Sequence, residues 1–219
     1  AETLRRSSSP GLKIGIYSTP WVTSYATHIG GSAENPEGLW NKPAIPKQGH
    51  TNRKILPWAI GKYSFATNDA RQWAAWGIDY LKYDWSPNEE PETREMYEAL
   101  RHSGRDIVFS LSNNTPYTNA PVLAKIANCW RTSGDIKANW LSMSAKGFGL
   151  DKWAGFCSPG HWNDPDMLEV GTKEANQPGL TPDEEYTHIT LWSLVSAPLF
   201  LGNDLPRLDG FPLHLWYTA

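Results

Sequence analysis

The 219-residue chain lacks the features that define several large classes of protein. No apolar run approaches the ~20 residues that a membrane-spanning helix needs. The net charge is only −3, so the sequence gives no electrostatic reason to expect binding to nucleic acid or to an anionic membrane. No GxGxxG or GxxxxGK(S/T) motif follows a predicted strand, which argues against a nucleotide-binding sheet.

Cysteine is scarce as well. Cys129 and Cys157 are the only two, and neither has the CxxC or Cys/His spacing of a metal site. We therefore expect buried thiols outside any disulfide. Tryptophan, in contrast, occurs 12 times. Indole rings stack on sugars but also fill cores, so this count favours a carbohydrate ligand only modestly.

The first ten residues are polar and lack the apolar centre of a signal peptide. We expect residues 1–10 to form a disordered or linker arm, and residues 11–219 to form one domain. Hydrophobic residues make up 40% of the chain and charged residues 20%, which is typical of a globular core.

The chain is organised around residues 77–85, GIDYLKYDW. Ile78, Tyr80 and Leu81 favour a buried strand. Lys82 and Asp84 lie two residues apart, so on a strand both project from the same face. A cation and a carboxylate at the carboxyl end of a strand are typical of a barrel enzyme, although a structural ion pair would give the same spacing.

Strands and helices alternate through the rest of the chain, which predicts a parallel sheet with helical crossovers. Polar residues recur where the predicted strands end, and this favours a (β/α)8 TIM barrel over a doubly wound sheet. Six repeats are too few to close eight strands, so we expect an incomplete barrel. The predicted strands are 11–18, 77–85, 106–112, 128–133, 161–170 and 197–204, and the predicted helices are 68–76, 92–102, 120–127, 136–148 and 182–196.

A long irregular segment, residues 19–66, separates the first strand from the first helix. Segments of this kind are usually functional lids or binding loops. Its aromatic residues could wall a sugar site or simply pin the segment to the barrel, and the sequence leaves both open. They are Trp21, Tyr25, Trp40 and Trp58.

Two carboxylates stand out as candidates for catalysis. Asp84 and Asp135 end different strands of the predicted barrel, and a carboxylate pair ~5–5.5 Å apart is the arrangement of a retaining glycosidase. Lys82 should hold Asp84 ionised, as a nucleophile requires. Asp135 comes just before a predicted helix, so a simple N-cap role is the structural alternative.

Four motifs, taken together, identify a family. GLKIGIYS, YLKYD, WRTSGDI and WNDPDMLEVG, in this order and at these intervals, resemble glycoside hydrolase family 27, the α-galactosidase or melibiase family. The resemblance spans most of residues 11–204. It implies a retaining (β/α)8 hydrolase with a C-terminal β-sandwich, no cofactor, and a secreted or periplasmic location.

The resemblance also assigns roles to individual residues. It implies that Asp84 is the nucleophile and Asp135 the general acid/base. Asp164 is implied to be structural, and a metal site built from His161, Asp164 and Asp166 is a poor fit to hard-cation chemistry. The implied sugar-binding residues are Tyr17, Lys82, Ser112, Arg131 and Asp166.

The chain departs from the family pattern at several places. Ser86 stands where the family has a disulfide cysteine after its KYD motif, so that disulfide is not expected. Ser112 stands where α-galactosidases carry a glutamate that contacts the 2-hydroxyl, and a small residue there is similar to members that accept a 2-acetamido group. The family's first two strands and its β-sandwich have no counterpart here, so we expect a fragment of a longer enzyme.

These observations favour an exo-acting retaining α-galactosidase whose partner is a carbohydrate, with no nucleic acid or membrane partner. The same family implies three alternative activities: α-N-acetylgalactosaminidase, β-L-arabinopyranosidase and isomaltodextranase. A non-catalytic sugar-binding fragment is the alternative from another class.

Overall fold

The computed structural model describes residues 11–37, 58–172, 178–208 and 210–218. The chain folds into two compact units, Ala1–Trp130 and Arg131–Ala219. The arm predicted for residues 1–10 lies outside the described residues, as does Trp40.

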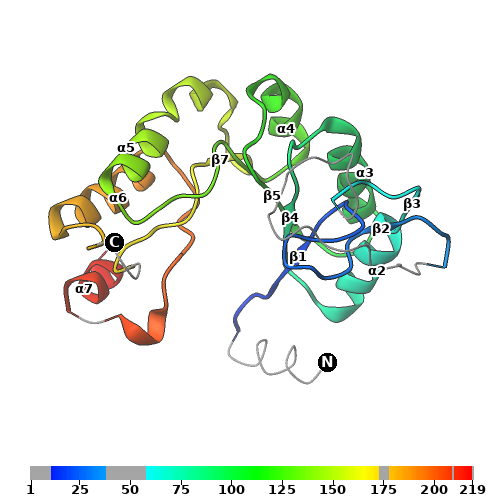
Figure 1. Cartoon of the computed structure of the whole chain (residues 1–219), viewed down its shortest axis with the longest axis horizontal. Helices are drawn as coiled ribbons and strands as arrows, with labels where there is room; N and C mark the ends of the chain where they lie inside the picture. Colours follow the sequence, from blue (N-terminus) through cyan, green and yellow to red (C-terminus); the bar gives the residue numbers. More distant parts are fainter. Residues whose placement is uncertain (1–10, 38–57, 173–177, 209, 219) are drawn as a thin grey trace. The chain divides into compact units, whose positions relative to one another are not determined.

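The first unit is built on a parallel sheet. Its strands pair in the order β1, β4, β5 and β6. Helices alternate with the strands along the chain, which confirms the predicted parallel α/β pattern (Figure 1). The strand bounds are Gly15–Ser18 for β1, Tyr80–Asp84 for β4, Val108–Ser112 for β5 and Cys129–Arg131 for β6.

Three helices of the first unit pack in sequence order: α2 (Ala66–Trp76) against α3 (Glu90–Arg101), and α3 against α4 (Ala120–Ile126). The predicted start of α2 at Asn68 or Asp69 is wrong. The helix begins at Ala66, and Phe65 occupies the N-cap position without a side-chain cap. The predicted end is confirmed, since Gly77 terminates α2 at φ 81°, a left-handed conformation that favours glycine.

The two faces of β4 carry different kinds of side chain. Leu81, Tyr83 and the following Trp85 alternate onto one face and are buried, and Tyr83 contacts Trp85 edge-on with ring centroids 5.1 Å apart. Lys82 and Asp84 share the other face, as the spacing predicts. The strand therefore builds the core with one set of side chains and presents charge with the other.

The described parts of the long segment after β1 pack onto the first unit. Strands β2 (Ser32–Ala33) and β3 (Tyr63–Ser64) form a short antiparallel pair. Trp21 and Trp58 are buried, and Trp21 meets Tyr25 edge-on with centroids 5.0 Å apart. Of the two roles that the sequence left open for these tryptophans, the structure favours pinning the segment.

The second unit places α5 (Trp140–Phe148) against α6 (Pro182–Leu194), and α6 against α7 (Gly210–Thr218) (Figure 1). A short strand, β7 (Trp162–Asp164), and the turn after it supply the inner side of this unit. The remaining elements are short 3₁₀ helices: η1 (Tyr117–Asn119) in the first unit, and η2 (Asp151–Phe156) and η3 (Leu205–Arg207) in the second. The second core contains Ile136, Met143, Leu168, Val170, Ile189, Trp192, Ala197 and Leu215.

Three predicted elements of the second unit are wrong in extent. The strand predicted at 161–170 is only Trp162–Asp164, because Pro165 follows it and has no N–H to donate to a ladder. The helix predicted from residue 136 begins at Trp140, because Asn139 is the N-cap and accepts a hydrogen bond from the Ser142 amide. The strand predicted at 197–204 is reduced to one parallel bridge between Leu168 and Leu201. Pro198 lies within that segment and has no N–H to donate to a ladder.

Neither cysteine forms a disulfide. Cys129 is buried, as predicted, whereas Cys157 is half-buried and therefore more exposed than predicted. Within the described parts of the chain, no helix is both long and apolar enough to cross a membrane.

Candidate active site

Four of the predicted site residues gather at the carboxyl end of the first unit's sheet. In the parallel register Tyr17 pairs with Lys82, and Asp84 pairs with Ser112. Register partners on adjacent parallel strands project from the same face. Side chains from β1, β4 and β5 thus meet where barrel enzymes carry their catalytic groups.

The contact at the centre of this group joins Tyr17 to Asp84. The Tyr17 hydroxyl donates to Asp84 Oδ2 at 3.0 Å, and Asp84 is only 8% exposed. Burial, followed by the charge of Asp84, raises the pKa of Tyr17 far above its usual range. The phenol therefore stays protonated, and it holds one carboxylate oxygen in a fixed direction.

A buried asparagine, Asn88, supports the chain directly after β4. Its Nδ2 donates to the carbonyl oxygens of Trp85 at 2.8 Å and Ser112 at 3.1 Å. Its Oδ1 accepts from the Thr115 hydroxyl at 2.7 Å. Asn88 thereby ties the end of the strand that carries Asp84 to the end of the strand that carries Ser112. Asn88 was not predicted as a site residue, since a lone asparagine in a loop gives no local signal.

The other three predicted residues meet in the second unit. The Arg131 side chain is 4% exposed, and its guanidinium forms ion pairs with two carboxylates. Its Nη1 lies 3.0 Å from Asp166 Oδ1, and its Nη2 lies 3.1 Å from Asp135 Oδ1. Asp166 is as buried as the arginine, whereas the Asp135 side chain is 85% exposed. One arginine thus anchors a buried carboxylate and orients an accessible one.

Asp166 is the fixed member of this group. Its Oδ2 accepts from the Ile136 amide at 2.7 Å, and its Oδ1 accepts from the Met167 amide at 2.8 Å. Its own amide donates to Asp164 Oδ1 at 2.8 Å, which gives Asp164 a role in holding the turn. The backbone of Asp166 has φ 99°, a conformation that a non-glycine residue adopts only when its surroundings impose it.

The N-cap alternative for Asp135 is wrong, because α5 begins at Trp140 and Asn139 caps it. Asp135 instead lies in the turn between β6 and α5. A neighbour of that turn, Lys146 on α5, was not predicted as a site residue. Its Nζ donates to the Gly134 carbonyl oxygen at 2.8 Å. Its position three residues after the buried Met143, on the inner side of the helix, was the available signal.

The structure thus brings together Tyr17, Lys82, Asp84 and Ser112 in one unit, and Arg131, Asp135 and Asp166 in the other. The predicted separation of the two catalytic carboxylates stays a prediction. Among the described residues, no three His, Cys, Asp or Glu side chains are grouped as metal ligands would be.

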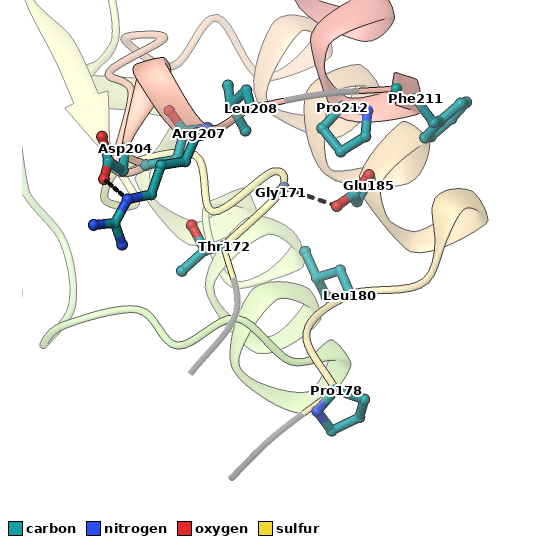
Figure 2. Close-up of a pocket in the computed structure, with 13 residues that line it drawn as sticks. Gly171, Thr172, Pro178, Leu180, Glu185, Asp204, Arg207, Leu208, Phe211 and Pro212 are labelled. Atoms are coloured by element: carbon teal, nitrogen blue, oxygen red, sulfur yellow. Dashed lines mark hydrogen bonds and ion pairs between the residues drawn. The ribbon is translucent and has the colours of Figure 1, made fainter. Parts of the chain in front are cut away.

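A cavity of about 440 Å³ lies in the second unit, between the turn after β7, the start of α6 and the segment from η3 to α7 (Figure 2). None of the predicted site residues lines it. Glu185 in its wall accepts from the Gly171 amide at 2.8 Å, and Arg207 pairs with Asp204 at 3.0 Å. The first contact ties the loop at Gly171 to α6, and the second lies within the η3 segment.

Comparison with known proteins extends this picture. The family described as alpha galactosidase A matches residues 49–212. The chain is 38% identical to alpha-galactosidase 2 of Arabidopsis thaliana over 94% of the chain and 44% of the relative. It is 42% identical to the alpha-galactosidase of Cyamopsis tetragonoloba over 73% of the chain and 38% of the relative. It is also 36% identical to the alpha-N-acetylgalactosaminidase of Gallus gallus, over 64% of the chain and 37% of the relative.

Solved structures show the same fold. Alpha-galactosidase I of Mortierella vinacea matches with a TM-score of 0.68 at 26% identity, over 92% of this chain and 49% of that one. The Saccharomyces cerevisiae enzyme solved with raffinose matches at 0.75 and 22% identity, over 98% and 46%. The β-L-arabinopyranosidase of Geobacillus stearothermophilus matches at 0.72 and 24% identity, over 98% and 54%. At the last two identities, the likeness shows the fold alone.

The chain spans less than half the length of the curated relatives named above. The structural matches confirm the predicted fold class, a (β/α)8 barrel of which these residues form a part. The family match covers well over half of the chain, and it agrees with the four sequence motifs and with the polar strand ends. The chain therefore belongs to the α-galactosidase (melibiase) family, family 27 of the glycoside hydrolases.

Proposed function

We propose that the full-length protein is a retaining exo-acting α-galactosidase that removes terminal α-galactosyl residues from a carbohydrate. In this mechanism Asp84 attacks the anomeric carbon, and the bond to the leaving oxygen breaks as Asp135 donates a proton to it. Water then hydrolyses the galactosyl–Asp84 ester while Asp135, now ionised, takes a proton from that water. The products are galactose and the shortened glycan.

One observation above all supports this proposal: Asp84 ends β4, Asp135 lies in the turn after β6, and a neighbouring side chain holds each carboxylate in a chain of the family 27 fold. Tyr17 fixes an oxygen of Asp84, which suits a nucleophile that must approach from one direction. Arg131 orients Asp135 while leaving its side chain open to an incoming leaving group. Lys82, Arg131 and Asp166 are the residues that would bind sugar hydroxyls in this proposal.

The test compares single substitutions in the full-length protein with 4-nitrophenyl α-galactoside as substrate. Asp84→Asn should abolish turnover without unfolding the protein. Asp79→Asn is the matched control, because Asp79 accepts from the Ile14 amide just before the sheet's amino end and should be dispensable for chemistry. Proton NMR of the first product should show the α-anomer of galactose. Turnover retained in the Asp84 variant, or release of the β-anomer, would refute the proposal.

Ser112 supports a second candidate, an α-N-acetylgalactosaminidase. Ser112 is buried at the end of β5 and is the register partner of Asp84. Its small side chain leaves room for a 2-acetamido group where a glutamate would fill the space. The 4-nitrophenyl glycosides of α-galactose and of α-N-acetylgalactosamine separate the two candidates directly. If the acetamido substrate is preferred, Ser112→Glu should reverse that preference.

A further inference from the structure

The turn that carries the proposed acid/base residue is fixed by one backbone contact and by side chains that bind its backbone groups. We call residues 132–137 the acid/base turn. At its start the Thr132 amide donates to the Asp164 carbonyl oxygen at 2.9 Å. At its end the Ile136 amide donates to Asp166 Oδ2 at 2.7 Å, and the Lys137 amide donates to the Ser142 hydroxyl at 2.9 Å. Both ends of the turn are thereby anchored.

The middle of the acid/base turn is held from α5. Lys146 Nζ donates to the Gly134 carbonyl oxygen at 2.8 Å and lies 3.4 Å from the Ser133 hydroxyl. A side chain built at Gly134 would meet no heavy atom within 4 Å among the described residues. Packing at Gly134 therefore does not fix this peptide. Its carbonyl oxygen is held by hydrogen bonds, from Lys146 at 2.8 Å and more weakly from the Ser133 hydroxyl at 3.3 Å.

This peptide matters because it is the one that enters Asp135. The carbonyl of Gly134 and the amide of Asp135 belong to the same plane, so a bond to that oxygen orients the peptide before Asp135. The bond from the Ile136 amide to Asp166 orients the peptide after it, and the two together set the direction in which the Asp135 side chain leaves the backbone. Arg131 then holds the carboxylate itself at 3.1 Å. Because the Asp135 side chain is 85% exposed, packing restricts its orientation little. The backbone bonds and Arg131 together restrict the orientations that the carboxylate can adopt.

We propose that Lys146 is a positioning residue for the acid/base function of Asp135. The inference rests on the α-glycosidase activity proposed above. Burial, and after it the charge of Arg131, lower the pKa of Lys146, while the charges of Asp166 and Asp135 act in the opposite direction. The ammonium is thus placed among the charged groups of the turn, where its bond to the Gly134 carbonyl is partly shielded from water.

A positioning role makes a prediction that a merely structural one does not. Proton donation matters most when the leaving group is a poor one, such as the sugar of raffinose. It matters least when the leaving group departs as a stable anion, such as 4-nitrophenolate. Misplacing Asp135 should therefore reduce turnover of raffinose more than turnover of 4-nitrophenyl α-galactoside, whereas general destabilisation should reduce both equally.

The experiment measures kcat and KM on these two substrates for the wild type and for three variants of the full-length protein. Lys146→Met keeps the aliphatic stem and loses the donor, so kcat/KM on raffinose should fall at least tenfold further than on the nitrophenyl substrate. Lys146→Arg keeps a charged donor and should restore most of the difference. Lys152→Met, at an exposed lysine of the same unit, should behave as the wild type.

Equal losses on the two substrates, or no loss, would overturn the role of Lys146. If Lys146→Met does not fold, Lys146→Gln takes its place, because it retains an N–H donor group. It should show a smaller change in substrate selectivity in the same direction. If Lys146→Gln shows no change in selectivity, the proposal is overturned as well. A wild type that cleaves neither substrate, or an Asp84→Asn variant that still cleaves them, would instead refute the activity itself and this inference with it.

Discussion

Replacing Arg131 by methionine separates the structural from the chemical part of the site. The arginine makes two ion pairs of nearly equal length, 3.0 Å to Asp166 and 3.1 Å to Asp135. Their surroundings differ sharply, since the Asp166 side chain is 4% exposed and the Asp135 side chain is 85% exposed. The free energy of unfolding should therefore depend almost entirely on the first pair.

The magnitude follows from what each carboxylate would lose. Removing one partner of a buried pair leaves a carboxylate without its counter-charge, which costs ~3–5 kcal/mol. The exposed pair with Asp135 contributes ~0–1 kcal/mol, because water solvates both groups when they separate. We therefore expect Arg131→Met to lower the free energy of unfolding by ~3–5 kcal/mol, and Asp135→Asn to lower it by under ~1 kcal/mol while abolishing turnover of raffinose.

Urea unfolding of the full-length protein at pH 7, followed by circular dichroism, measures both changes. Arg131→Lys is the matched control. It keeps the charge, but one ammonium cannot reproduce the forked geometry, so its loss should be intermediate. If Arg131→Met costs less than ~1 kcal/mol, or if Asp135→Asn costs as much as Arg131→Met, the division of roles within this group is wrong.

Three further predictions concern stability. Burial lowers the pKa of His188 to about 3, so below pH ~6.5 the unfolded chain takes up a proton that the folded chain does not. Stability should then fall by up to ~1.4 kcal/mol per pH unit between pH 6 and 4, and His188→Phe should remove that slope in urea titrations at several pH values. Burial raises the pKa of Asp69 to about 6, so its favourable contribution to the free energy of unfolding is present in acid and is lost as the pH rises through 6. Asp69→Asn should accordingly stabilise the protein at pH 7 by ~1–2 kcal/mol, and an unchanged melting temperature there would contradict this reasoning. Asn88→Ala removes a fully buried side chain with three hydrogen bonds, so it should lower the free energy of unfolding by ~2–4 kcal/mol; a loss below ~1 kcal/mol would show that these bonds add little.

The sequence predicted best what depends on local pattern. Alternation placed Lys82 and Asp84 on one face of a strand, and the glycine at position 77 marked the end of α2. The order of the four motifs was enough to identify the family. Each of these features is encoded within a few consecutive residues, or in the spacing of such groups along the chain.

The errors came from partners distant in sequence. Residues 136–139 have a plausible helical composition, but the backbone of Asn139 is extended, with φ −149° and ψ 157°, so α5 begins only at Trp140. The Ile136 amide bonds instead to Asp166, 30 residues further on. The Gly134 carbonyl is held by Lys146 through a contact that only the packing of α5 creates. Such bonds leave no trace in local propensity, which is why the sequence left an N-cap role open as the alternative for Asp135.

The alternation along β4 has a consequence for how enzymes of this type diversify. Leu81, Tyr83 and Trp85 are buried on one face of the strand, while Lys82 and Asp84 lie on the other face, where the proposed substrate would bind. The buried and the opposite-face positions of β4 are under separate constraints. Residues that determine sugar specificity can therefore be substituted while the buried residues that stabilise the strand stay unchanged. Ser112, one strand over and in register with Asp84, is the kind of position at which a new preference can arise at little structural risk.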